Sequence, residues 1–228
     1  MARVRSEKEF NLKKKQIVNY AIELLIEVGY ENFSINKVIN NAKTTKGAFF
    51  HYFLSKEELI EEILNIILDP MINEFYNIAN KSNVNPKEKI LELFAIGYKM
   101  KGIESKLTQQ LIKFLHKKEN KIIFQEIIDR IITRCLPIYE QVFIEGKNSK
   151  EFSIKYPHGE AFIFLNTILS INKEIGKISM EKCTNKKSKE NLNNKILAFE
   201  LYAKKMFNFN SDVNLYNKIF LSLNNSLN

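Results

Sequence analysis

The chain has 228 residues, of which 45% are apolar, and this composition excludes an intrinsically disordered protein. The length is sufficient for one sizeable hydrophobic core and a small additional module. The formal net charge of +9 permits a nucleic acid or an acidic membrane as partner but requires neither. Seven glycines and four prolines provide too few turn signals for an all-β protein, so we predict an all-α fold.

The first predicted helix ends near Gly29, which we expect to act as its C-cap. Basic residues between Arg3 and Lys15 precede or begin this helix. Its apolar residues recur with helical spacing, at Ile17, Ala21, Leu24, Leu25 and Val28.

The next stretch, Phe33 to Leu59, predicts two short helices joined by a tight turn and followed by a third helix. Ser34 and Thr45 are suited to cap the two short helices, because their side-chain oxygens can accept backbone N–H groups of the first turn. In the second short helix, Phe49 and Phe53 lie one turn apart and can pack onto the first helix. The first short helix carries its apolar side on Ile35, Val38, Ile39 and Ala42.

A rotation of about 100° per residue places the other side chains of the second short helix on its outer face. These residues are Gly47, Ala48, Phe50 and His51, with Lys46 at the helix start. Small residues would let the helix backbone approach a nucleic-acid groove, and Lys46 offers positive charge to a phosphate. The arrangement is typical of a DNA-binding helix-turn-helix.

The third helix has a complete predicted start. Ser55 and Glu58 fit a capping box, and Leu54 and Leu59 fit a hydrophobic staple. We therefore expect this helix to leave the preceding one at a fixed angle. It should extend to about residue 80, with Pro70 either kinking it or ending its first half.

The run from Ala42 to Leu59 resembles the DNA-binding signature of tetracycline-repressor (TetR) type regulators, A-x-x-[TS]-K-G-x-[FL]-[FY]-x-[YH]-F-x-S-K-E-x-L. In the preceding helix the resemblance includes Ile17, Ala21, Leu24, Leu25, Gly29 and Tyr30. Three positions depart from the pattern: Lys43 where glycine is common, Thr44 where valine is common, and Phe50 where a tyrosine usually contacts the DNA backbone. Phe50 lacks the hydroxyl, which leaves an apolar contact to a sugar or a thymine methyl.

The resemblance implies a three-helix DNA-binding domain over residues 1–56 and a larger helical domain over residues 57–228 for effector binding and dimerisation. Residues 57–80 would form the helix that links the two domains. The residues expected to contact DNA bases or backbone are Lys46, Gly47, Ala48, Phe50, His51 and Tyr52. Contacts to phosphates are expected from Ser34, Lys37, Thr45 and Lys56.

The second domain also contains clear helix signals. Asn85, Pro86 and Glu88 supply an N-cap, a proline at the first helical position and an acidic residue in the first turn. Later helices are expected after Gly102, over about residues 119–145 with Gly146 beyond the end, at about 158–175 and at about 189–207.

The last two of these helices are the expected dimer contact. Residues Ala161 to Ile171 are apolar nearly all round, which a helix tolerates only when it is buried on more than one side. In TetR regulators the two helices at this place in the chain join their copies from a second subunit as a four-helix bundle. The resemblance therefore implies a homodimer formed through residues 158–175 and 189–207.

Aromatic residues are frequent in the second domain, which in TetR regulators encloses an effector pocket between helices. Each of them is more readily explained as ordinary core than as pocket lining. The candidate pocket residues are Phe94, Tyr98, Phe114, Phe124, Tyr139, Phe143 and Phe162. Their chemistry indicates a small apolar or aromatic effector.

The sequence contains no arrangement typical of an enzyme or a metal site. Cys135 and Cys183 have no CxxC partner, and His51, His116 and His158 are scattered. No nucleophile elbow and no phosphate-binding glycine loop occurs. We predict no catalytic residue, no metal and no cofactor.

A membrane location is not expected either. The basic N-terminus lacks the apolar segment of a secretory signal, and the apolar run Ala161 to Ile171 has about half of the roughly 20 residues needed to span a bilayer. We expect a soluble cytoplasmic protein.

These patterns together predict a homodimeric transcriptional repressor that binds a pseudo-palindromic operator and is released by a small molecule. Two alternatives remain open. A sequence-tolerant architectural protein would bind random duplex nearly as well as any site, and a helical partner-binding protein with a degenerate DNA module would show no salt-dependent DNA binding.

Overall fold

The computed structural model describes residues 7–101, 110, 114–180 and 186–210. Within these ranges every regular element is a helix, which confirms the predicted all-α fold. The elements are α1 (Glu7–Asn32), α2 (Ile35–Asn41), α3 (Lys46–Phe50), α4 (Lys56–Ala79), α5 (Pro86–Lys101), the short 3-10 helix η1 (Lys118–Asn120), α7 (Lys121–Asn148), α8 (Pro157–Met180) and α9 (Lys186–Met206). The helix predicted after Gly102 and the C-terminal pattern beyond residue 210 fall largely outside the described residues.

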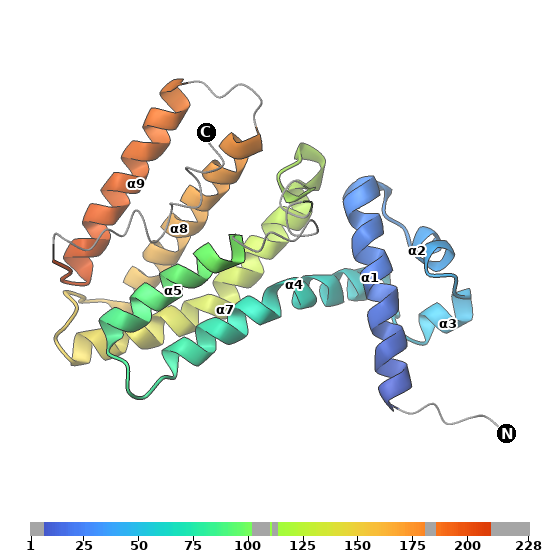
Figure 1. The fold of residues 1–228 in the computed structure, drawn as a ribbon, viewed down its shortest axis with the longest axis horizontal. Coiled ribbons are helices and arrows are strands. Elements are labelled where there is room, and N and C mark those ends of the chain that lie inside the picture. Colours follow the sequence, from blue (N-terminus) through green and yellow to red (C-terminus); the bar gives the residue numbers. More distant parts are fainter. Residues whose placement is uncertain (1–6, 102–109, 111–113, 181–185, 211–228) are drawn as a thin grey trace.

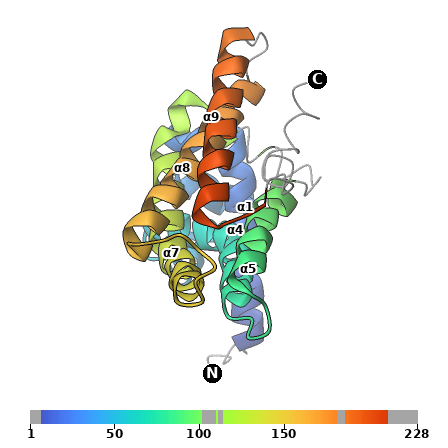
Figure 2. The same cartoon turned by 90° about the vertical axis from the view of Figure 1, so that its left-hand side faces the viewer.

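The helices are arranged around α4, which runs from the N-terminal module into the larger bundle (Figure 1). Helices α1, α2 and α3 gather at one end of the molecule, α5 and α7 accompany the second half of α4, and α8 and α9 lie on the side away from α2 and α3 (Figures 1 and 2). One cluster of buried apolar side chains extends through both ends. The boundary after residue 56 stays a prediction, because the core is continuous across it.

Side-chain caps begin the helices of the N-terminal module, as predicted. The hydroxyl oxygens of Ser34, Thr45 and Ser55 accept the backbone N–H three residues further on, at 3.4, 3.1 and 3.1 Å. The Glu58 carboxylate accepts the N–H of Leu54 at 2.6 Å, one residue earlier than in a standard capping box. The predicted hydrophobic staple is wrong, because the Leu54 side chain is 79% exposed.

Glycine and proline positions account for two differences from the predicted helix ends. Gly29 interrupts α1 with φ +79° and ψ 165°, a conformation that residues with a Cβ rarely adopt. Gly146, in contrast, does not end its helix, since α7 continues to Asn148. A Cβ at Gly146 would overlap the ring of Phe152, so this glycine serves close packing. Pro70 lies inside α4 and does not end it.

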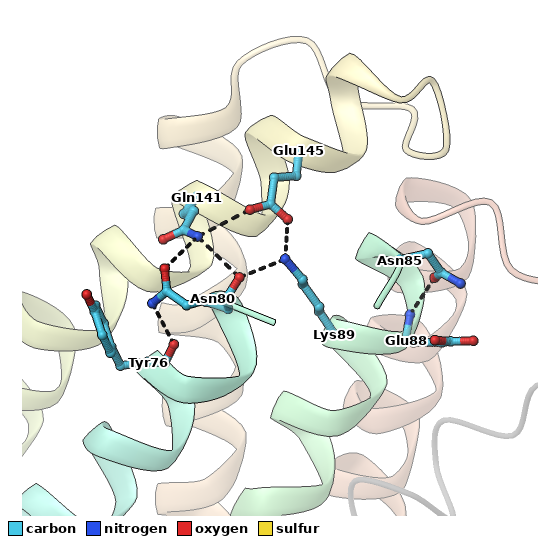
Figure 3. A network of polar contacts seen from close by, with 8 residues as sticks. Tyr76, Asn80, Asn85, Glu88, Lys89, Gln141 and Glu145 are labelled. Carbon is cyan, nitrogen blue, oxygen red and sulfur yellow. Dashed lines mark hydrogen bonds and ion pairs between the residues drawn. The ribbon is translucent and has the colours of Figure 1, made fainter. Parts of the chain in front are cut away.

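Polar contacts anchor the far end of α4 to α5 and α7 (Figure 3). Lys89 is buried, with 4% of the residue exposed, and its Nζ donates to the Ala79 carbonyl at 2.7 Å and to Glu145 Oε2 at 2.6 Å. Gln141 Nε2 donates to the same carbonyl and to Glu145 Oε1, both at 3.2 Å. A buried lysine is stable only when its charge is paired, and this network supplies the pairing.

Replacing Lys89 with methionine should lower the free energy of unfolding by about 1–2 kcal/mol. Methionine fills a similar volume, so the loss reports the hydrogen bonds to Ala79 and Glu145 rather than a cavity. Glu145 remains partly hydrated and Gln141 keeps its contacts, which limits the effect. Urea denaturation of both proteins measures the difference. Unchanged stability would mean that the pair contributes nothing beyond its desolvation cost.

The helices of the described residues were also compared with the requirements for a membrane span. Among the residues described, no helix combines the length and the apolar character that crossing a bilayer requires.

Candidate nucleic-acid interface

The α2–turn–α3 unit presents its outer side to solvent. Phe49 and Phe53 are fully buried with ring centroids 5.7 Å apart, as predicted, although α3 ends at Phe50 and Phe53 follows it instead of lying within the helix. Lys46, Gly47 and His51 are exposed, and Phe50 is 36% exposed. Ala48 is half-buried. The predicted outward orientation of this face is therefore confirmed, whereas its contact with DNA stays a prediction.

Gly47 leaves unused space on this outer face. No described atom lies within 4 Å of the position that a Cβ on Gly47 would occupy. The protein itself therefore does not require a glycine there. The missing side chain exposes the helix backbone to a partner.

The turn before α3 contains Lys43, where the TetR pattern commonly has glycine. Lys43 adopts φ +45°, the left-handed conformation in which glycine has no steric penalty. A lysine in this conformation costs about 1–2 kcal/mol. The turn is nevertheless formed, with backbone hydrogen bonds from Lys43 N to Asn40 O and from Thr44 N to Ile39 O.

Tyr52, one of the predicted DNA contacts, lies differently from the exposed residues of α3. Its side chain is only 5% exposed and packs on Phe10 of α1, with ring centroids 4.7 Å apart. This burial argues against a base contact by the Tyr52 ring, and the predicted contact of Tyr52 with bases or backbone stays untested. The α-helical turn ends at Phe50, so the residue two positions later turns back into the core.

Sequence reasoning missed the role of Phe10. Its ring meets the His51 ring edge-on at 5.4 Å between centroids and also contacts Tyr52, so it helps to position the exposed histidine. The sequence could have predicted that Phe10 faces inward, because it lies seven residues before Ile17 and therefore on the same face of α1.

A shallow groove of about 320 Å³ lies beside α3. Its lining residues come from the start of α2, from α3 and from the start of α4: Phe33, Ser34, Ile35, Asn36, Lys46, Phe50 and Lys56. The lining thus combines apolar side chains with two lysines. Among the described residues, neither Lys46 nor Lys56 has a carboxylate within ion-pair distance. This combination suits an anion attached to an apolar group, such as a phosphate with its sugar.

Lys56 in the groove and Lys37 next to its lining residue Asn36 both donate to backbone carbonyls. Lys56 Nζ donates to the Tyr30 carbonyl at 3.4 Å and lies 4.5 Å from the centre of the Tyr30 ring. Lys37 Nζ donates to the Asn32 carbonyl at 3.0 Å. Each amine keeps further donors for a phosphate.

The candidate effector residues do not form one surface. Phe94, Tyr139 and Phe143 are buried and pack around Phe164, with ring centroids 5.6, 6.0 and 5.6 Å from it. Phe162, in contrast, is 48% exposed and lies at the surface, apart from this aromatic group, so its role as a pocket residue stays a prediction. In a helix, residues 162 and 164 point about 200° apart, and only the second faces the core.

The remaining candidates lie near η1. Phe114 is buried, and Phe124 is half-buried with its ring centroid 5.2 Å from that of His116. Burial, with a smaller contribution from Lys173, lowers the pKa of His116. The side chain of Tyr98 lies outside the described residues.

Neither metal nor thiol chemistry is indicated by the residues that the structure describes. They include no group of three or more His, Cys, Asp or Glu side chains placed to hold a metal ion. Burial raises the pKa of Cys135 to about 12, which leaves its thiol protonated and unreactive at neutral pH.

The helix-turn-helix matches a known family. Residues 17–63 match the family described as bacterial regulatory proteins, tetR family. The uncharacterized HTH-type transcriptional regulator YuxN of Bacillus subtilis is 35% identical over 71 residues, which are 31% of this chain and 24% of YuxN. The HTH-type transcriptional repressor KstR2 of Mycobacterium tuberculosis is 23% identical over 143 residues.

The match to KstR2 covers 63% of this chain and 62% of that protein, so this chain spans less than two thirds of the length of both relatives. The fold likeness extends further. A TetR-family transcriptional regulator from Pectobacterium atrosepticum superimposes with a TM-score of 0.59 over 89% of this chain and 98% of its own, at 14% identity. Proteins of this family are DNA-binding transcriptional regulators rather than enzymes. Over residues 17–63 the chain therefore matches the TetR family of bacterial regulatory proteins, and over most of its length it has the fold of a TetR-family regulator.

Proposed function

We propose that the protein is a homodimeric transcriptional repressor that binds a pseudo-palindromic operator through α3 and is released by a small effector. The outer face of α3 carries this proposal. It combines an open glycine, an exposed histidine and a lysine without a carboxylate partner among the described residues. Such a face fits a DNA major groove, where small residues allow close approach and polar side chains read base edges.

Each side chain has a distinct proposed role. Lys46, Gly47, Ala48, Phe50 and His51 would contact bases or the adjoining backbone. Phosphate contacts would come from Ser34, Lys37, Thr45 and Lys56 around the groove and the helix starts. Phe50 would place an apolar ring against a sugar or a thymine methyl, since it has no hydroxyl to offer a phosphate.

Exposed apolar side chains on α8 and α9 support a dimer. They are Phe162 and Ile163 on α8 and Leu197, Leu201 and Tyr202 on α9, each 40–58% exposed. Regulators of this family act as dimers, and these faces would pack against their copies in a second subunit. The two-fold axis would set the two α3 helices into successive major grooves about 34 Å apart, or a multiple of this distance.

An effector would bind in the larger domain, near the aromatic residues between α5, α7 and α8. The relative KstR2 is a transcriptional repressor, which supports repression as the output. The aromatic side chains favour an apolar or aromatic small molecule. A protein that acts on chromosomal DNA would work in the cytoplasm.

Selection of DNA fragments from the protein's own genome tests the proposal. We expect enrichment of a two-fold related sequence. His51→Ala should change the preferred bases, whereas Lys56→Ala should weaken binding to all sequences and reduce the slope of log affinity against log salt by about one.

Two outcomes would contradict the proposal. Equal affinity for random duplex and for every selected fragment would indicate an architectural DNA-binding protein. Absence of salt-dependent binding would indicate that the helix-turn-helix serves a protein partner instead.

A further inference from the structure

Asn120, at the end of η1, joins the N-terminal module to the larger domain. Its side chain is fully buried. The side-chain oxygen Oδ1 accepts the backbone N–H of Tyr30 at 3.1 Å, and Nδ2 donates to the Phe114 carbonyl at 2.8 Å. The hydrogen bond to Tyr30 therefore joins residues that lie 90 positions apart in the chain.

The geometry at the end of α1 prepares this contact. Gly29 departs from helical φ and ψ, so the chain turns there and the N–H of Tyr30 meets the Asn120 side chain. A buried amide without partners would be costly, but here both ends of the Asn120 amide are used. The directional hydrogen bonds fix an orientation that apolar contacts alone would leave free to slide.

The contact continues to the candidate DNA groove. The Tyr30 carbonyl accepts Lys56 Nζ at 3.4 Å, and Lys56 lines the groove together with Phe50 of α3. Both backbone polar groups of Tyr30 are thus bound by residues from outside α1. A series of contacts runs from Phe114 through Asn120 and Tyr30 to Lys56.

We propose that Asn120 is a positioning residue that sets the angle between the DNA-binding module and the larger domain, and thereby the operator half-site spacing that the dimer accepts. The inference rests on the proposed function. Each added base pair moves the second half-site by about 3.4 Å and turns it by about 35°, so a stiff joint rejects a wrong spacing and a loose joint tolerates it.

The test uses the full-length protein and a DNA library in which the selected half-sites are separated by different spacer lengths. Asn120→Leu, which keeps a similar volume but removes both hydrogen bonds, should reduce the preference for the best spacer over spacers one base pair shorter or longer from about tenfold to about twofold or less. Affinity for a single half-site should stay unchanged.

Two further variants separate positioning from stability. Asn120→Asp keeps an acceptor for Tyr30 but loses the donor to Phe114, so it should also relax the spacing. Phe152→Leu removes core volume in the α7–α8 loop, at the other end of the molecule from α1, and should leave the spacing preference intact (Figure 1). If Phe152→Leu lost the spacing preference as much as Asn120→Leu, the loss would be due to lower stability, and the proposal would be overturned.

Hydrogen exchange of the Tyr30 amide provides a readout that does not depend on DNA. Exchange should become about tenfold faster in Asn120→Leu and stay close to the wild-type rate in Asn120→Asp. If the wild-type protein selected no operator, the proposed function would fail. The exchange rate would still show whether Asn120 holds the Tyr30 amide. An unchanged rate in Asn120→Leu, or an unchanged spacing preference in a protein that selects an operator, would overturn the inference.

Discussion

Replacing Gly47 with leucine is expected to lower operator affinity about 100-fold, which corresponds to about 2.7 kcal/mol, without destabilising the protein. The outer face of α3 has no described atom within 4 Å of a Cβ at this position, so the added side chain meets nothing in the protein. In the proposed complex it would hold α3 away from the groove. Several base and phosphate contacts, each worth about 1–3 kcal/mol, would then lengthen together.

Thermal unfolding and DNA titration of the same preparations separate the two effects. Gly47→Ala should unfold at a slightly higher temperature than the wild type, because glycine within a helix costs about 0.5–1 kcal/mol relative to alanine. Asn73→Leu places a leucine on an exposed position of α4 and serves as the control, with affinity expected to stay at the wild-type level. If Gly47→Leu bound the operator as tightly as the wild type, α3 would not be the element that enters the groove.

The N-terminal module was predictable because its signals are local. Ser34, Thr45 and Ser55 each bind an N–H three residues away, and such short-range capping is visible directly in the sequence. The apolar spacing that placed Phe49 and Phe53 inside was equally local. Helix starts, the turn and the outer face of α3 followed from these few residues.

The failures arise where the determining partner is distant in sequence. Asn120 reads as an ordinary polar residue at a helix start, and only the fold brings Tyr30 to it. Gly146 looks like a helix end because the sequence does not reveal that the Phe152 ring packs against it. Tyr52 follows a helix of five residues, too short for its direction to be read from periodicity.

The predicted effector pocket shows a further limit. Between Ala161 and Ile171 the chain is apolar on nearly every side, so periodicity cannot distinguish an inward residue from an outward one. The structure turns Phe164 into the aromatic core and leaves Phe162 at the surface. The same all-round apolarity that obscured the pocket is what a helix between a core and a second subunit requires.

The double variant Ile163→Glu and Leu201→Glu is expected to convert the proposed dimer into a folded monomer. These side chains are 55% and 58% exposed in the single chain, so glutamate is tolerated there, whereas pairing of α8 and α9 with their copies would bury four unpaired carboxylates per dimer.

Loss of the second subunit and its α3 helix should lower operator affinity by about 10²- to 10⁴-fold, while affinity for one half-site stays unchanged. Sedimentation velocity reports the mass, circular dichroism the retained helices, and titration the affinity. Tyr76→Glu with Ile122→Glu is the matched control, because these residues are 59% and 67% exposed on α4 and α7 and add the same charge away from the proposed interface. If both double variants were monomers, or if both were dimers, the subunit contact would not lie on α8 and α9. Two α3 helices would then have to reach one operator by another arrangement of the subunits.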